Sequence, residues 1–234
     1  MDLIQALAAE LGKDPRHVEN VVHLLDEGNT IPFIARYRKE LHGAMDDTSL
    51  RTLEERLQYL RGLEERREAV KKSIDEQGKL TDELAAAIDS AKTLAEVEDL
   101  YRPYKQKRRT RATMAKEKGL EPLAALLFAQ ERDCPRPEEA ARNFVDPEQG
   151  VETVEDALQG ASDIIAEQIS DGAAIRKSLR ALISRHGQLV SRAATEDDSV
   201  YRLYYDFTQS VARLQGHQVL AINRGEKEGI LKVS

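Results

Sequence analysis

The sequence has little of the material from which cross-linked, metal-bound or membrane-embedded proteins are built. Of its 234 residues one is cysteine, Cys134, and none is tryptophan. A single cysteine excludes an internal disulfide and a zinc or iron–sulfur site made of Cys ligands, and it suits a reducing cytosol. No secretory signal is visible, and no uncharged stretch approaches the roughly 20 residues that a membrane span needs. We therefore expect a cytoplasmic protein that has no membrane partner.

The motifs of the common enzyme and cofactor classes are lacking as well. There is no Walker loop, no dinucleotide-binding glycine fingerprint, no HExxH zinc motif, no GxSxG elbow and no EF-hand loop. The five histidines form no i, i+4 pair that could hold a metal on a helix. Cys134 has no neighbouring lysine or histidine that would activate its thiol. We predict no catalytic, cofactor-binding or metal-binding residue, and no enzymatic activity.

Aromatic residues are also few, with seven Tyr and four Phe, whereas Ala, Leu, Glu, Lys and Arg are abundant. Residues that favour helices therefore far outnumber those that favour sheets. With 41% apolar and 33% charged residues, the chain suits one large soluble domain or two small ones. The composition predicts a mainly α protein, built as a helical bundle.

Three short helical patterns fill the first 40 or so residues. Asp14 followed by Pro15 is a helix start, Gly28 is a stop, and Thr30 with Pro32 opens a third helix. Short helices joined by tight turns are compatible with a helix-turn-helix arrangement. An ordinary small helical bundle, the more common origin of such a pattern, stays open as the alternative.

A long uninterrupted pattern follows from Asp47 to Gln77, in which Gly62 is the only internal glycine. One helix over this stretch would be about 46 Å long at 1.5 Å per residue. Its apolar stripe consists of Leu50, Leu53, Leu57, Leu60, Leu63, Val70 and Ile74. We predict a single continuous helix that links two modules, with its many glutamates on a solvated surface.

Helical patterns continue to residue 186, after which the chain changes character. Further helices are expected from Thr81, from Thr93, and near 111–118, 122–131, 137–144, 154–170 and 173–186. Beyond them we expect a short strand at 188–193, a Tyr-rich helix at 200–207, and a β-hairpin made of 219–222 and 230–233. The chain thus divides into a helix-turn-helix-like module (1–45), a long connecting helix (46–78), a helical scaffold (79–187) and a mixed segment with strands (188–234), the truncated start of a next region.

One segment opposes the acidic character of the whole chain. Between Arg102 and Lys118 there are eight basic residues and one acid, so this window carries +7. Because the whole chain carries −7, the remainder carries −14. A basic element on an acidic body can contact phosphates at one face while the body discourages indiscriminate binding. The candidate nucleic-acid-binding residues are Lys105, Lys107, Arg108, Arg109, Arg111, Lys116 and Lys118.

Several long motifs resemble one protein family. They are GNTIPFIARYRKELHGAMDDTSLRTLEERLQYLR at 28–61, EDLYRPYKQKRRTRAT at 98–113, YYDF at 204–207 and LAINRGEKEGIL at 220–231. In this order they resemble the N-terminal region of the bacterial Tex family, the transcription accessory proteins. His42 and Ala44–Met45 stand where many relatives show a Gly-Gly-Leu run, and Gln106 stands where a proline is common.

The resemblance implies a cytoplasmic, non-enzymatic nucleic-acid-binding protein linked to transcription. A Tex protein is understood to carry a helix-turn-helix-like part, a helical scaffold with a long central helix, an RNase H-like domain, helix-hairpin-helix elements and an OB-type RNA-binding domain. Only the first two would fit in these residues, with the C-terminal hairpin leading toward the absent RNase H-like domain. Strong RNA or DNA binding is therefore not expected of this part alone.

Three functional hypotheses remain. The leading one is a scaffold of a transcription-associated nucleic-acid-binding protein that makes weak, non-specific phosphate contacts. The second is a protein-interaction scaffold that docks onto RNA polymerase or another domain without binding nucleic acid itself. The third is an enzyme such as a metal-dependent nuclease, for which no carboxylate cluster can be nominated from the sequence.

Overall fold

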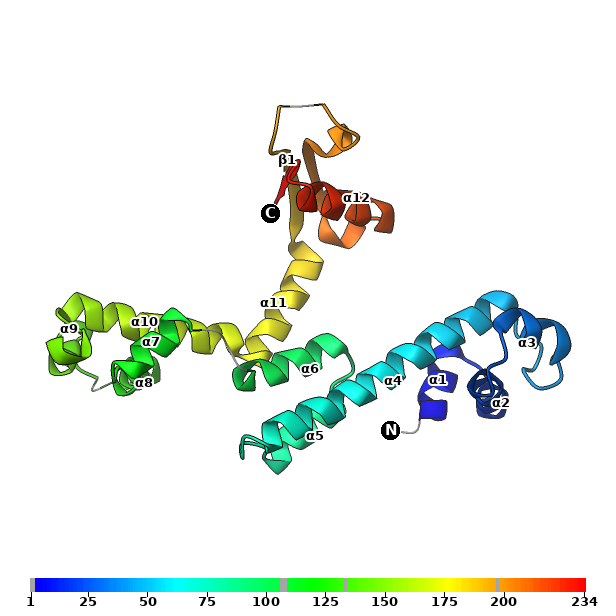
Figure 1. Cartoon of the computed structure of the whole chain (residues 1–234), viewed down its shortest axis with the longest axis horizontal. Coiled ribbons are helices and arrows are strands. Elements are labelled where there is room, and N and C mark those ends of the chain that lie inside the picture. Colours follow the sequence, from blue (N-terminus) through cyan, green and yellow to red (C-terminus); the bar gives the residue numbers. More distant parts are fainter. Residues whose placement is uncertain (1–2, 106–108, 133, 197) are drawn as a thin grey trace. The chain divides into compact units, whose positions relative to one another are not determined.

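The chain folds into two compact units, Met1–Tyr101 and Arg102–Ser234. The computed structural model describes residues 3–105, 109–132, 134–196 and 198–234 (Figure 1). Each unit has a hydrophobic cluster of its own, built around α4 in the first unit and around α10 in the second. The mainly α prediction is confirmed, since helices make up most of the described chain.

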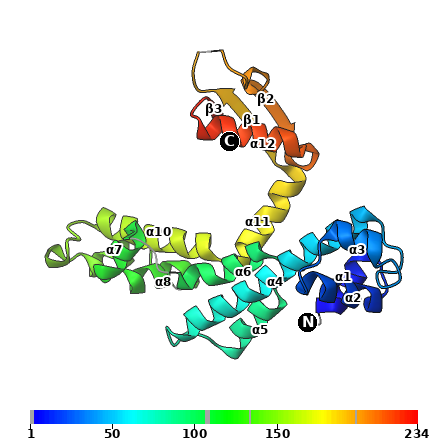
Figure 2. The same ribbon diagram turned by 45° about the vertical axis from the view of Figure 1, so that its right-hand side comes forward.

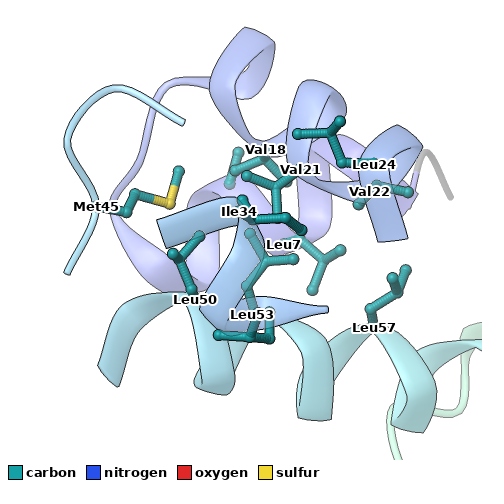
Figure 3. Close-up of a cluster of buried hydrophobic side chains, with 12 residues drawn as sticks. Leu7, Val18, Val21, Val22, Leu24, Ile34, Met45, Leu50, Leu53 and Leu57 are labelled. Atoms are coloured by element: carbon teal, nitrogen blue, oxygen red, sulfur yellow. The ribbon is translucent and has the colours of Figure 1, made fainter. Parts of the chain in front are cut away.

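Three short helices begin the first unit, as the sequence predicted. They are α1 (Leu3–Leu11), α2 (Pro15–Asp26) and α3 (Ile31–Tyr37). The Asp14 carboxylate accepts a hydrogen bond from the Arg16 backbone N–H, and Pro15 occupies the first helical position. Their apolar faces meet α4 in one cluster, drawn in Figure 3, whose buried members include Leu7, Val18, Val21, Ile34, Leu50, Leu53 and Leu57.

The predicted long helix is confirmed as α4 (Asp47–Asp75), which continues through Gly62. Asp46 caps it by accepting from the Ser49 backbone N–H at 2.8 Å. Its first half belongs to the cluster of Figure 3, whereas α5 (Asp82–Ser90) and α6 (Leu94–Tyr101) contact its second half. The apolar stripe of α4 therefore packs against α1, α2 and α3 along its first half and against α5 and α6 along its second half.

The helices of the second unit gather around α10. In chain order the elements are η1 (Arg102–Tyr104), α7 (Arg111–Glu117), α8 (Glu121–Ala129), α9 (Pro137–Ala141), η2 (Arg142–Phe144), η3 (Pro147–Gln149), α10 (Val154–Asp171) and α11 (Ala173–His186). Helices α7, α8 and α9 pack against α10 (Figures 1 and 2), and small and branched side chains are buried between them. Gly160 permits this approach, because a Cβ at that position would overlap the Leu120 side chain. The helices expected between 111 and 186 are confirmed.

A three-stranded antiparallel sheet follows. Its strands are β1 (Gln188–Ala193), β2 (Asp206–Ser210) and β3 (Leu231–Val233), in the order β2-β1-β3. The register pairs Val190 with Thr208 and Arg192 with Lys232. The short helices η4 (Arg202–Tyr204) and η5 (Val211–Arg213) flank β2, and α12 (Gly216–Lys227) packs against β3. The expected small antiparallel C-terminal sheet is confirmed, as are the strands at 188–193 (β1) and 230–233 (β3), but β3 pairs with β1 and not with 219–222 as predicted.

Two local predictions in this region are wrong. The segment 219–222, expected as a strand, lies inside α12, where Ile222 and Gly225 are buried at helical spacing. A run of four apolar residues cannot distinguish a strand from a buried helix, and here packing against Leu231 of β3 decides for the helix. The segment 200–207, expected as a Tyr-rich helix, forms η4 and the start of β2. Pairing of β2 with β1 overrides the local helical pattern.

No helix in the described part of the chain has both the length and the apolar character to cross a membrane.

Candidate nucleic-acid interface

Five of the seven basic residues singled out from the sequence lie in the described chain, whereas Lys107 and Arg108 lie outside it, as does Gln106. Lys105 follows η1, Arg109 precedes α7, Arg111 and Lys116 are in α7, and Lys118 caps its end. The start of α7 is held by a reciprocal cap between two threonines. Thr110 Oγ1 accepts from the Thr113 backbone N–H at 3.0 Å, and Thr113 Oγ1 accepts from the Thr110 N–H at 2.7 Å.

An open hollow of about 560 Å³ lies between this stretch and α10. Its charged lining consists of the cations Arg102, Lys105, Arg109 and Arg111 and the acids Asp163, Glu167 and Asp171. The four cations exceed the three acids by one charge. A surface of this kind can attract an anion, although the acids of α10 reduce the attraction.

The three arginines of this hollow are paired with carboxylates. Arg102 Nε lies 3.0 Å from Asp171 Oδ1, and an Arg111 Nη lies 3.6 Å from Asp163 Oδ1. The Arg111 side chain is 79% exposed while that of Asp163 is only 15% exposed, so the arginine reaches from solvent toward a largely covered acid. Arg109 pairs with Glu117 at 3.2 Å, and both side chains are exposed. An ion pair exposed on both sides, such as Arg109 with Glu117, contributes about 0–1 kcal/mol, so a phosphate can compete with Glu117 for Arg109.

The other two described candidates are positioned differently. Lys116 Nζ lies 3.3 Å from a Glu121 carboxylate oxygen and borders a second hollow of about 750 Å³ between α8 and α10, which Lys105 also lines. Lys118 Nζ donates a hydrogen bond of 2.7 Å to the Gly150 carbonyl oxygen, and so holds the loop that precedes α10. The structure therefore brings Lys105, Arg109 and Arg111 to one hollow and directs Lys118 to a structural contact.

Sequence reasoning missed Arg102 and the acids of α10 as members of this surface. Arg102 was counted in the basic window but not among the candidate residues. Asp163, Glu167 and Asp171 are spaced i, i+4, i+8, which places them on one helix face, and this spacing was readable in the sequence. Their contact with a segment some 60 residues earlier depends on the tertiary structure and cannot be predicted from a local sequence pattern.

Within the described residues, no group of three or more His, Cys, Asp and Glu side chains is arranged to hold a metal ion. The acids of α10 are instead engaged with arginines of the basic segment. The chemistry of the surface is thus that of cation–anion contact.

Fold and surface together define a helical scaffold with a cation-lined hollow. Residues 1–75 match the model of the Tex-like protein N-terminal domain, and residues 133–234 match that of the Tex central region-like domain. The chain belongs to the Tex family, which confirms the resemblance seen in its motifs. The basic segment lies between the two matched regions.

Relatives cover nearly the whole chain. It is 48% identical over 236 residues to the protein YdcI of Bacillus subtilis, which covers 99% of this chain and 33% of the relative. It is 42% identical to the transcriptional accessory protein Tex of Neisseria gonorrhoeae, over 100% of this chain and 31% of the relative. It is 31% identical to the human S1 RNA-binding domain-containing protein 1, over 99% of this chain and 24% of the relative. The chain therefore spans about a third or less of the length of these relatives.

Proposed function

We propose that this chain is a cytoplasmic, non-enzymatic scaffold of a transcription-associated nucleic-acid-binding protein, and that its basic segment makes weak, non-specific phosphate contacts. The observation that carries the proposal is the convergence of Arg102, Lys105, Arg109 and Arg111 on one hollow. The names of two relatives support it, since one is called a transcriptional accessory protein and another an S1 RNA-binding domain-containing protein. Neither RNA nor DNA is favoured by a contact that reads only phosphate.

The contacts are expected to be weak for two electrostatic reasons. The carboxylates of Asp163 and Asp171 already form ion pairs with two of the cations, so a phosphate gains only the difference between two pairings. The chain outside the basic window also carries −14 and repels a polyanion. If about three phosphates are neutralised, the slope of log affinity against log salt is about −2 to −3, and affinity falls roughly 20- to 40-fold between 50 and 200 mM salt. The dissociation constant is expected no lower than the non-specific range of about 10⁻⁴ to 10⁻⁶ M.

A triple variant tests the proposal. Lys105→Ala, Arg109→Ala and Arg111→Ala together remove three charges from the hollow. The measurement is fluorescence anisotropy with a labelled single-stranded RNA, its DNA counterpart and a duplex, at two salt concentrations. We expect lower affinity and a slope shallower by about 2 to 3, with little change in melting temperature.

The matched control removes the same three charges elsewhere. Lys72→Ala, Lys79→Ala and Lys227→Ala change exposed lysines outside the basic window. This control is expected to keep the salt slope of the parent chain. If the hollow variant keeps the parent affinity and slope, phosphate contact by this surface is refuted.

A protein-interaction scaffold is the second candidate, and the internal ion pairs of the basic segment favour it. If Arg109 and Arg111 serve mainly to join the segment to α7 and α10, the triple variant has a lower melting temperature and keeps its nucleic-acid affinity. Such a scaffold would dock onto RNA polymerase or another protein of the transcription machinery. A pull-down that retains polymerase after nuclease treatment would support this function over the first.

The non-enzymatic part of the proposal has its own test. The purified chain is expected to leave labelled RNA and DNA intact over a long incubation with magnesium or manganese. Cleavage that co-purifies with the chain and is lost in an Asp163→Asn variant would contradict it.

A further inference from the structure

The outer face of α3 carries two aromatic rings that the first unit leaves exposed. Ile31 and Ile34 belong to the buried cluster of Figure 3, whereas Phe33 and Tyr37 lie on the opposite side of the helix. Phe33 is 37% exposed and Tyr37 is 56% exposed. Their ring centroids are 5.2 Å apart, and the ring planes are tilted by 47°. One exposed apolar side chain is ordinary, but two adjoining rings form a patch of the kind that protein partners cover.

Arg38, which follows the last residue of α3, is held against these rings. Its guanidinium carbon lies 5.2 Å from the centroid of the Phe33 ring, within the range of a cation–π contact. Its Nη1 donates a hydrogen bond of 3.2 Å to the Tyr37 carbonyl oxygen. Because these two contacts orient the planar guanidinium, it loses less freedom when it binds a carboxylate through two parallel hydrogen bonds.

The three cations of this surface, Arg36, Arg38 and Lys39, are available to a partner. They form no ion pair in the part of the chain that the structure describes. Arg36 and Lys39 are exposed, and no side-chain nitrogen of Arg38 is both buried and without a hydrogen bond. Glu40 is the acid beside them, so the four side chains together carry +2. The rings are therefore bordered by positive charge that no carboxylate of the described chain neutralises.

The charge of the first unit as a whole has the opposite sign. Residues 1–101 contain 14 Lys and Arg against 22 Asp and Glu, a net charge of −8. A nucleic acid laid on α3 would extend beyond the Debye length of about 8–10 Å and meet the repulsion of the whole unit. A short acidic segment of a protein meets mainly the local +2. A symmetric contact with a second copy would bring the same three cations together. The charges thus favour a short acidic peptide.

We propose that the outer face of α3 binds a short segment of a partner protein in which an Asp or Glu stands next to a large apolar side chain. The carboxylate accepts hydrogen bonds from the Arg38 guanidinium, and Arg36 and Lys39 add attraction from their exposed positions. The apolar side chain packs on Phe33 and Tyr37. Because the patch is small, the binding is weak and readily reversible. The contact is independent of the hollow beside α10, since none of these residues lines it.

The test titrates the whole 234-residue chain, labelled with ¹⁵N, with three short synthetic peptides. The first peptide alternates Asp with Leu and Phe, the second has Lys in place of Asp, and the third has Ser in place of Leu and Phe. We expect the first peptide to shift the amide resonances of α3 and to bind about tenfold more tightly than either of the others. Equal binding of the three peptides, or no shift at α3 with a large excess of the first, overturns the proposal.

Variants of this surface locate the contact. Phe33→Ala with Tyr37→Ala, and separately Arg38→Gln, are each expected to weaken binding of the first peptide about tenfold. Phe128→Ala, which removes a ring of similar exposure in the second unit, is the matched control and leaves binding unchanged. Circular dichroism checks that each variant stays folded, and Tyr37→Ala alone, at the more exposed ring, replaces the double variant if that one unfolds. Unchanged binding in a folded ring or Arg38 variant overturns the proposal.

Other occupants of the face are distinguished with the same variants. The ring variant is expected to keep the affinity of the parent chain for labelled single-stranded RNA, and a loss of that affinity would assign the face to nucleic acid. Sedimentation equilibrium is expected to give a monomer, whereas a dimer that the ring variant dissociates would assign the face to a second copy. Either result overturns the proposal. Phosphate contact is tested separately at Lys105, Arg109 and Arg111, so the two proposals can fail independently.

Discussion

The turn between α3 and α4 holds two residues in the left-handed backbone region. Gly43 has φ of 61° and Ala44 has φ of 57°. A Cβ at position 43 would overlap the His17 ring, so glycine is needed there for space as well as for backbone freedom. Ala44 has a Cβ, and a residue with a Cβ is strained at positive φ. This is the turn where the sequence departs from the glycine-rich pattern of the family it resembles.

Ala44→Gly is expected to stabilise the chain. Relief of the left-handed strain, about 1 to 2 kcal/mol, outweighs the entropy that glycine adds to the unfolded chain, which leaves a gain of about 0.5 to 1 kcal/mol. Urea unfolding followed by circular dichroism measures it. The control is Ala86→Gly at an exposed position inside α5, where the same substitution should cost about 1 kcal/mol. A loss at both positions would show that Ala44 is not strained.

His42, in the same turn, is buried in a way that the sequence does not predict. Its side chain is almost fully buried, and within the described part of the chain neither ring nitrogen has a hydrogen-bond partner. A histidine in a turn between two helices is expected to be at least partly exposed. His17 and Asn20 of α2 form hydrogen bonds with the carbonyl oxygen of the neighbouring Leu41, so this turn packs against α2, which local spacing does not reveal.

At the scale of elements, α4 contains a glycine that its packing does not require. Gly62 lies in the middle of the helix, and a Cβ built there has no atom within 4 Å. The position therefore carries the full entropic cost of glycine in a helix and no packing benefit.

Gly62→Ala is expected to raise the free energy of unfolding by about 0.5 to 1 kcal/mol. Gly160→Ala in α10 is the matched substitution, and it is expected to destabilise, because its Cβ would overlap Leu120. Thermal and urea unfolding of the two variants give the comparison. Destabilisation by Gly62→Ala would contradict this prediction and would show that a Cβ at position 62 is not accommodated.

The helices were predictable because their signals are local. An N-terminal cap and a stripe at helical spacing give the start and course of α2, α4 and α10 from a dozen residues each, and Pro15 adds a first-turn signal in α2. The strand expected at 219–222 failed because four apolar residues fit either element, and contact with Leu231 of β3 decides between them. The basic segment was likewise visible as a run of charge, but its pairing with Asp163 and Asp171 depends on how α10 folds back beside it.

At the scale of the molecule, charge pairs join the short helices of the first unit to α4. Arg56 holds the pKa of Glu10 below its ordinary value, chiefly by donating hydrogen bonds to that carboxylate from α4 to α1. Arg61 lowers the pKa of Asp26 in the same way, from α4 to α2. Both carboxylates are about half exposed, so each pair contributes at most about 1 kcal/mol.

Acid should therefore weaken the first unit. Because these carboxyls have a lower pKa in the folded chain, their stabilisation is complete above the ordinary carboxyl pKa, near pH 4, and is lost as pH falls through the folded value. Hydrogen exchange of α1 and α2 at pH 6 and pH 3 measures the loss.

Glu10→Gln with Asp26→Asn is expected to reduce stability at pH 6 by up to about 2 kcal/mol and to flatten the dependence on acid. The exposed pair Glu19→Gln with Glu40→Gln serves as the control and should leave that dependence unchanged. An unaltered acid response in the first variant would remove these pairs as its cause.

The length of α4 also constrains how this sequence can change. The helix buries Leu50 and Leu53 in one cluster and Val70 and Ile74 further along, where α5 and α6 lie. Inserting one residue near Gly62 would turn the distal half by about 100° and shift it by about 1.5 Å, so Val70 and Ile74 would leave the face that α5 and α6 cover. Insertions of about 7 or 11 residues, close to whole numbers of turns, would keep the two faces in phase. Substitutions in α4 leave the spacing between its two packing sites unchanged, whereas a single insertion or deletion between them alters it.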